Sequence, residues 1–124
     1  MEESYLHSDL TEKIIGFAFD IYNQIGPRYP EYIYQRAFET KFKDNNIPYQ
    51  RECYCRLELD GKKIAAFRLD FLVSKSVVLE LKVRDYPLST DMKQILTYMN
   101  NNKIEVGLIV RFTTKKVEIK RLVL

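Results

Sequence analysis

The chain has 124 residues, a length that suits one domain, residues 1–124, around one hydrophobic core. Hydrophobic residues make up 46% of it and charged residues 30%, an ordinary globular balance with no apolar run near the roughly 20 residues of a membrane helix. The formal charge of +3 permits contact with an anionic polymer but does not require it, because a solvated surface gives the same count.

The N-terminal arm, residues 1–8, belongs to the acidic stretch MEESYLHSDL, which lacks the apolar segment of a signal peptide. Cys53 and Cys55 are the two cysteines, and we expect free thiols in a reducing, cytoplasmic environment. Two cysteines and one histidine are a poor zinc-binding set. Because His7, the single histidine, lies in the arm, a Ser-His-Asp or Cys-His catalytic site is disfavoured.

The first two predicted elements are helices. The first runs from Asp9 to Gln24 and ends at Gly26-Pro27. Ser8 or Asp9 is expected to cap it, with Glu12 placed for a capping box. Its apolar residues recur at helical spacing, at Ile14, Phe17, Ala18, Ile21 and Ile25. The second helix begins near Pro30, a residue favoured in a first helical turn, and runs to Asp44.

Strands follow, with one more helix between them. The predicted strands are Tyr49–Leu59, Lys62–Val73, Val77–Val83, Val106–Phe112 and Val117–Val123. Asp60-Gly61 is a strong hairpin signal between the first two strands. The third helix is predicted from Thr90 to Asn101, before the last two strands. The order ααβββαββ predicts an α/β or mixed α+β domain, with helices packed beside a mixed sheet.

The strand Val77–Val83 reads VVLELKV and carries two charges inside an apolar run. Side chains alternate faces along a strand, so Glu80 and Lys82 share one face and their apolar neighbours share the other. Charged residues are almost never fully buried unless they are paired. The two charges of this strand therefore require partners.

The segment Ser74-Lys75-Ser76 decides what lies opposite these charges. If all three residues form the loop, the register places Asp70 opposite Glu80 and Arg68 opposite Lys82, with all four on one face. A two-residue loop would shift the register by one and turn Asp70 to the other face. We expect the three-residue loop.

Two interpretations of this charged face remain open from the residues alone. In the first, the two cations pair diagonally with the two acids and form a solvated salt-bridge network. In the second, Asp70 and Glu80 hold a divalent cation, because hard cations take oxygen ligands and Mg²⁺ often uses one or two carboxylates with water and phosphate. Lys82 would then hold the attacking water or stabilise the charge that develops on phosphate.

Several segments occur together and in order along the chain: IGPRYPEYIYQRAF, RLDFLV, VVLELKV, DMKQILTYMN, VGLIVRF and IKRLVL. From about Ile14 to Leu124 the chain thereby resembles the GxxExxY proteins, a branch of the PD-(D/E)xK nuclease-like superfamily. The resemblance implies a restriction-endonuclease-like core, in which helices flank a central mixed sheet. It also implies Mg²⁺-dependent hydrolysis of phosphodiester bonds, with Mn²⁺ as the alternative metal.

By this resemblance, Asp70 and Glu80 are the metal-binding acids and Lys82 is the catalytic lysine. Glu31 matches a helix glutamate that would aim a third acid at the metal, although the helix dipole alone also favours a carboxylate in a first turn. Tyr34 matches the tyrosine of the family name. Packing, or a bond to Glu31, explains this tyrosine better than a chemical role does.

Gln94 matches a glutamine on the helix after the lysine strand, with Tyr98 one turn further on. We expect Gln94 either to orient the lysine or a water, or simply to be solvated. Arg68 and Arg84 flank the proposed site and would either contact phosphate or neutralise the acids. Further basic residues are expected to be mostly solvated, with a patch that binds a nucleic-acid backbone as the alternative: Lys62, Lys63, Lys115, Lys116, Lys120 and Arg121.

The chain departs from the family pattern at three positions. Arg28 occupies the position of the glycine in the family name, where glycine would allow a positive φ or a close backbone approach. Tyr22 lies where relatives often have histidine, and Leu69 lies where the superfamily has proline. These departures leave the acids and the lysine in place, but they bring into question the local shape of the turn at residues 26–31.

Three functions are compatible with these residues. The first is a small metal-dependent nuclease that cuts DNA or RNA, which the presence of Asp70, Glu80 and Lys82 together favours. The second is a non-catalytic module that holds nucleic acid or a protein, and the third is a metal-free fold with a salt-bridge network. The sequence predicts a nucleic-acid partner and no membrane, and it leaves open whether the chain forms a homo-oligomer.

Overall fold

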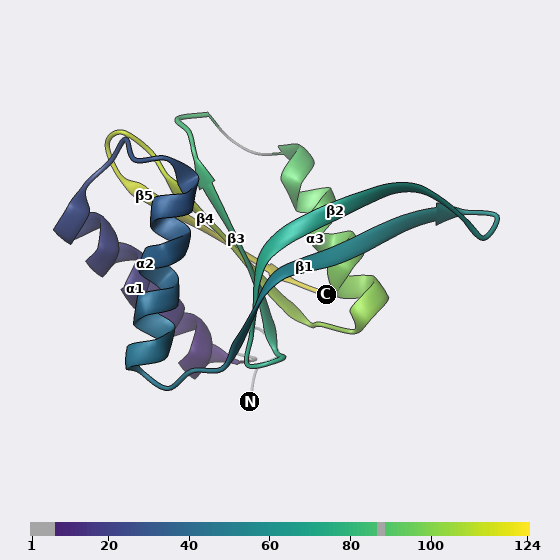
Figure 1. Ribbon diagram of the computed structural model, residues 1–124, viewed down its shortest axis with the longest axis horizontal. Helices are drawn as coiled ribbons and strands as arrows, with labels where there is room; N and C mark the ends of the chain where they lie inside the picture. The colour runs from purple at the N-terminus through teal and green to yellow at the C-terminus, as the bar shows by residue number, and fades with distance from the viewer. Residues whose placement is uncertain (1–6, 87–88) are drawn as a thin grey trace.

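The computed structural model describes residues 7–86 and 89–124, and its elements follow the predicted order ααβββαββ (Figure 1). The helices are α1 (Ser8–Ile25), α2 (Glu31–Asp44) and α3 (Ser89–Asn102). The strands are β1 (Tyr49–Leu59), β2 (Lys62–Val73), β3 (Val77–Val83), β4 (Val106–Phe112) and β5 (Val117–Val123). None of the described helices is long and apolar enough to cross a membrane.

The start of α1 differs from the prediction. His7 occupies the cap position in a left-handed conformation with φ 54°, and its side chain makes no capping hydrogen bond. Ser8 is already helical, and its carbonyl accepts a hydrogen bond of 3.1 Å from the Thr11 hydroxyl. The predicted capping box with Glu12 is therefore wrong, because the helix begins before the residues that were expected to cap it.

The described strands form one five-stranded sheet in the order β1-β2-β3-β4-β5. Neighbouring strands are antiparallel, except that β3 and β4 run parallel. The parallel pair follows from the connection between them, since the chain passes through α3 and a parallel pair needs such a crossover. The predicted mixed sheet flanked by helices is thus confirmed.

Helices cover both faces of the sheet (Figure 1). α1 and α2 pack on one face, in a core that includes Leu79 of β3, and α3 packs on the other face, in a second cluster that includes Val78. Burial on both faces explains the nearly continuous apolar run of β3. α3 packs closely over Gly107 of β4, where a Cβ would lie 2.9 Å from the sulfur of Met99.

The β2–β3 pairing is short. It runs from Val73, opposite Val77, to Phe71, opposite Leu79, and no further pair follows within the described residues. β1 and β2 nevertheless stay paired with each other as far as their connecting turn. The two strands therefore leave the sheet together as a long ribbon, which projects to the right in Figure 1.

The ribbon twists at the point where it leaves β3. Phe71 packs in the core beneath α2, whereas Leu69 packs in the cluster beneath α3. Residues two apart share a face in a flat strand, so β2 must turn over between them, at Asp70. On β1, Glu52 lies between the residues paired with Phe71 and Leu69, and its backbone is left-handed with φ 58°. The charged residues of β2 and β3 thus meet where the sheet splits.

Candidate functional site

The loop between β2 and β3 sets the register of the site. Val73 pairs with Val77, and the Ser76 N–H donates a hydrogen bond of 2.9 Å to the Val73 carbonyl. Ser74 and Lys75 complete the turn with positive φ values of 50° and 55°. The prediction of a three-residue loop is confirmed, and with it the register that brings Asp70 to the level of Glu80.

Asp70 and Glu80 interlock where the β2–β3 ladder ends. The Leu81 N–H donates to Asp70 Oδ2 at 2.7 Å, and the Asp70 N–H donates to Glu80 Oε1 at 3.0 Å. Carboxylate oxygens thus replace the backbone carbonyls that would accept these N–H groups in a continuous ladder. Each strand keeps its buried donor satisfied while the two backbones separate, which leaves both acids at the fork of the sheet.

Both acids are buried, with 8% of Asp70 and 4% of Glu80 exposed. Burial, followed by the nearby charge of Asp70, raises the pKa of Glu80 to about 8. The positive charge of Lys82 lowers the pKa of Glu80, because Lys82 Nζ lies 3.2 Å from Glu80 Oε2. Two buried carboxyls side by side therefore favour either a proton or a cation between them.

The diagonal network that was one interpretation of the sequence, in which Arg68 pairs with Glu80 and Lys82 with Asp70, is absent among the ion pairs of the described residues. Lys82 pairs with Glu80 of its own strand, and Arg68 lies 3.6 Å from Glu52 of β1. The reason is the fork: Arg68 belongs to the ribbon, and its partner in the register is Tyr54 rather than a residue of β3.

Glu31 lies in the first turn of α2 and is half-buried. Burial and the charge of Asp70 raise the pKa of its carboxyl, while Lys82, Arg84 and Arg68 lower it. Glu31 therefore lies within the electrostatic reach of the fork. In the described part of the chain, however, no group of three or more His, Cys, Asp or Glu side chains is close enough to hold a metal ion, so Glu31 does not complete a three-carboxylate cluster.

Two side chains that the sequence did not single out as site residues hold Asp70. Gln35 of α2 donates to Asp70 Oδ1 at 2.8 Å, and Arg51 of β1 donates to Gln35 Oε1 at 3.2 Å. The same guanidinium donates to the Asp70 carbonyl at 3.3 Å and to Glu39 at 2.8 Å. Gln35 lies one helical turn after Glu31, which is the one local signal for it, whereas the place of Arg51 depends on how α2 packs on the ribbon.

Tyr34 and Tyr98 lie in the two packed layers. Tyr34 is fully buried and stacks on Phe112 with ring centroids 4.2 Å apart. Its hydroxyl donates a hydrogen bond of 2.6 Å to the Gly26 carbonyl. Tyr98 of α3 packs in the cluster between this helix and the sheet, and burial raises its pKa. Gln94 lies one turn before Tyr98 and is half-buried, and its contribution to the site stays a prediction.

The turn before α2 keeps the backbone conformation that the motif glycine would provide. Arg28 has φ 78°, in the region where side chains other than glycine are disfavoured. The side chain of Arg28 is exposed, so no packing offsets this strain. Arg28 therefore strains this turn, across which the Tyr34 hydroxyl donates a hydrogen bond to the Gly26 carbonyl.

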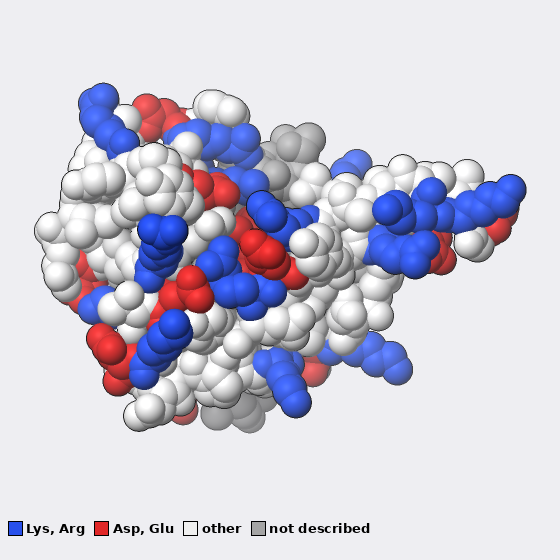
Figure 2. All heavy atoms as spheres, in the orientation of Figure 1, with Lys and Arg blue, Asp and Glu red and all other residues white. Residues whose placement is uncertain are grey.

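The remaining basic residues fall into two separate groups. Lys62 and Lys63 begin β2 at the tip of the ribbon, whereas residues 115–121 lie on β5 or just before it, at the opposite edge of the sheet. One patch made from both groups is therefore wrong. Figure 2 shows acidic side chains near the middle of this face with lysines and arginines around them, and further basic residues along the ribbon.

The donor set at the fork fits a hard divalent cation such as Mg²⁺ or Mn²⁺. Asp70 and Glu80 supply oxygen ligands, and each carboxylate oxygen keeps a second lone pair beside the hydrogen bond that it accepts. Burial of two like charges also disfavours the pair in the absence of a cation. A cation between the two acids would replace the proton that the raised pKa of Glu80 otherwise retains.

Comparisons with known proteins agree with this fold. The family model described as PD-(D/E)XK nuclease superfamily matches residues 8–122. The crystal structure of SSO0001 resembles the chain with a TM-score of 0.58 at 21% sequence identity. The match covers 97% of this chain and 59% of that one, so it shows the fold alone. A search of curated proteins returned no significant match. The chain, through a family match over nearly its whole length, belongs to the PD-(D/E)XK nuclease superfamily.

Proposed function

We propose that the chain is a metal-dependent nuclease of the GxxExxY branch, which hydrolyses phosphodiester bonds in DNA or RNA. The observation that carries the proposal is the interlocked pair of Asp70 and Glu80, buried at the fork of the sheet with Lys82 against Glu80. In a solvated salt-bridge face the acids would be exposed to water. Asp70 and Glu80 are instead only 8% and 4% exposed, and each accepts a hydrogen bond from the backbone of the other's strand. We also expect the chain to act in the cytoplasm.

In this proposal Asp70 and Glu80 would hold Mg²⁺ or Mn²⁺, with Glu31 as a nearby third acid. The bound metal would supply Lewis-acid polarisation of the scissile phosphate and a more acidic water. Lys82 stabilises the charge that develops on phosphate, or orients the attacking water through its N–H donors. Gln94 is the candidate second orienting group.

Other side chains have supporting roles. Gln35 and Arg51 fix the orientation of the Asp70 carboxylate through the hydrogen bonds that join α2 to β1. Arg68 and Arg84 lie close enough to the site to act on the Glu31 carboxyl, and their guanidinium groups suit phosphate oxygens. Positioning of this kind lowers a barrier because the reacting groups are already oriented.

The test is cleavage by purified protein of single- and double-stranded DNA and RNA, with Mg²⁺ or Mn²⁺. We expect cleavage that a chelator abolishes and that Glu80→Gln and Lys82→Ala each reduce at least a hundredfold, a typical loss for one stabilising group. Glu58→Gln and Lys13→Ala, two exposed charges away from the fork, are matched controls. Cleavage that persists in both site variants would contradict the proposal, and tight binding without cutting would favour the non-catalytic module.

A further inference from the structure

Three exposed tyrosines each lie beside an arginine on elements that converge at the fork. Tyr32 is on α2, Tyr54 is on β1, and Tyr86 follows the end of β3. Their exposed fractions are 51%, 64% and 61%, so most of each ring faces solvent. These rings contribute little to either core, and their large apolar faces remain available to a ligand.

The arginines contact or neighbour these rings. The guanidinium of Arg36 lies 5.2 Å from the centroid of the Tyr32 ring. The guanidinium of Arg84 lies 4.8 Å from the centroid of the Tyr86 ring and donates a hydrogen bond of 3.3 Å to the Tyr86 hydroxyl. Arg68 is the cross-strand partner of Tyr54 in the β1–β2 ladder. We call these six residues the tyrosine–arginine rim.

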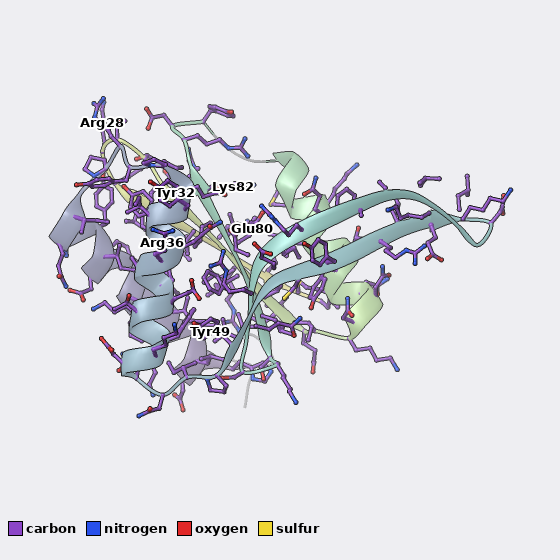
Figure 3. The ribbon with its side chains drawn as sticks, viewed as in Figure 1. Arg28, Tyr32, Arg36, Tyr49, Glu80 and Lys82 are labelled. Atoms are coloured by element: carbon purple, nitrogen blue, oxygen red, sulfur yellow. The ribbon has the colours of Figure 1, made fainter. Side chains whose placement is uncertain are left out.

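The rim lies around the carboxylates rather than elsewhere on the molecule. Tyr32 directly follows Glu31 on α2, Arg84 lies two residues after Lys82, and Arg68 lies 3.6 Å from Glu52 of β1. In Figure 3, Tyr32 and Arg36 on α2 are labelled at the level of Lys82 and Glu80 on β3. The rim therefore combines ring faces and guanidinium groups at the site where the proposed chemistry takes place.

This combination matches an unpaired nucleic-acid strand. A base can stack on a tyrosine ring only if its own face is free, and in a duplex both faces are covered by neighbouring base pairs. A guanidinium carries N–H donors in a planar arrangement that suits phosphate oxygens, and its positive charge attracts the nucleic-acid backbone. Because the three rings come from three separate segments of the chain, a flexible strand suits them better than a rigid duplex.

We propose that the tyrosine–arginine rim binds single-stranded DNA or RNA. Unpaired bases stack on the tyrosines, and the bound backbone then lies next to Asp70 and Glu80. The proposal rests on the proposed function only for the place of the cut. The binding step stands on the rim alone, because the exposed rings and the guanidinium groups need no metal. A measurement without metal therefore separates the two.

The experiment is fluorescence anisotropy with a labelled oligonucleotide in the presence of a chelator, so that nothing is cut. We expect the wild type to bind single-stranded DNA or RNA at least tenfold more tightly than a duplex of equal length. Tyr32→Ala, Tyr54→Ala and Tyr86→Ala should each weaken binding of the single strand by about tenfold. The matching phenylalanine variants keep the ring and should bind like the wild type.

Phe19→Ala is the control for removal of an exposed aromatic, because Phe19 lies on α1 outside the rim. Equal affinity for duplex and single strand, or unchanged binding in all three alanine variants, overturns the proposal. Loss of binding in the phenylalanine variants as well would overturn stacking as its basis. If the wild type shows the expected binding but cuts nothing in Mg²⁺ or Mn²⁺, the proposed function fails while the rim proposal is supported.

Discussion

The peptide N–H of Asp70 donates to Glu80 Oε1 at 3.0 Å, so the second acid of the site holds the backbone of the first. The reciprocal bond runs from Leu81 N–H to Asp70 Oδ2 at 2.7 Å. Neither acid can therefore be replaced without effects on the strand that carries the other. Variants that keep the shape and hydrogen-bonding atoms of each side chain are the informative ones.

Glu80→Gln should stabilise the metal-free protein at neutral and alkaline pH. The folded-state pKa of Glu80 is about 8 and the ordinary value is 4.5, so between these pH values the folded chain holds a proton that the unfolded chain releases. The free energy of unfolding then falls as pH rises through this window. The glutamine variant lacks this loss and should be more stable at pH 8 by about 1–3 kcal/mol. Urea denaturation with a chelator measures it.

The comparison is made at pH 5 and pH 8, where Glu80→Gln should show a smaller decline in stability than the wild type. Glu58→Gln, at an exposed position of the ribbon, should follow the wild-type profile. If wild type and Glu80→Gln decline in parallel, Glu80 does not retain a proton in the folded chain.

Mg²⁺ or Mn²⁺ should stabilise the wild type by cancelling the repulsion between Asp70 and Glu80. Binding to the folded state alone adds RT ln(1 + [L]/Kd), or about 1.4 kcal/mol when the metal is at ten times its Kd. The effect should be larger at pH 8 than at pH 5, because protons compete less for the carboxylates. Thermal unfolding at increasing metal concentration is the measurement.

Asp70→Asn is the matched variant for this measurement, since asparagine keeps an oxygen acceptor for the Leu81 N–H but loses the charge. It should show little stabilisation by either metal. An equal rise in melting temperature in wild type and Asp70→Asn would place the metal elsewhere.

Arg51→Ala should destabilise the fold and weaken catalysis without changing the residues that contact substrate. Arg51 joins Gln35, Glu39 and the Asp70 carbonyl, and its loss leaves partly buried acceptors unpaired, at about 1–3 kcal/mol. Because it acts by positioning Asp70, the loss should appear in kcat and in the metal Kd more than in oligonucleotide affinity. Arg51→Lys keeps the charge but not the planar set of N–H donors, so its stability and kcat should be intermediate between those of the wild type and Arg51→Ala. Equal kcat in all three proteins would contradict this positioning role.

Arg28→Gly should stabilise the protein relative to Arg28→Ala. The backbone at this position has φ 78°, where an L-residue costs about 1–2 kcal/mol and glycine does not. Glycine loses part of this advantage through its greater freedom in the unfolded chain, so we expect a net gain of about 0.5–1 kcal/mol. Chemical denaturation of the two variants measures it, and a glycine variant no more stable than the alanine variant would show that the turn relaxes.

The sequence predicted most of the fold because its signals are local. Each strand has the predicted bounds, and the Ser74-Lys75-Ser76 loop fixed the level of Asp70 and Glu80. The sequence did not reveal the fork, since alternation along β2 gives no sign that the strand turns over at Asp70. Gln35 and Arg51 were missed for a related reason: they are 35 and 19 residues from Asp70, and contacts over that separation depend on tertiary packing.

The fork has a mechanical consequence. Asp70 belongs to the ribbon and Glu80 to the central strand β3, so the two acids lie on opposite sides of the point where the ribbon leaves the sheet. A tilt of the ribbon relative to β3 would alter the distance between the carboxylates. On the ribbon, Cys53 and Leu69 pack in the cluster beneath α3. A ligand that binds the ribbon far from the acids and tilts it would therefore change the distance between the two carboxylates.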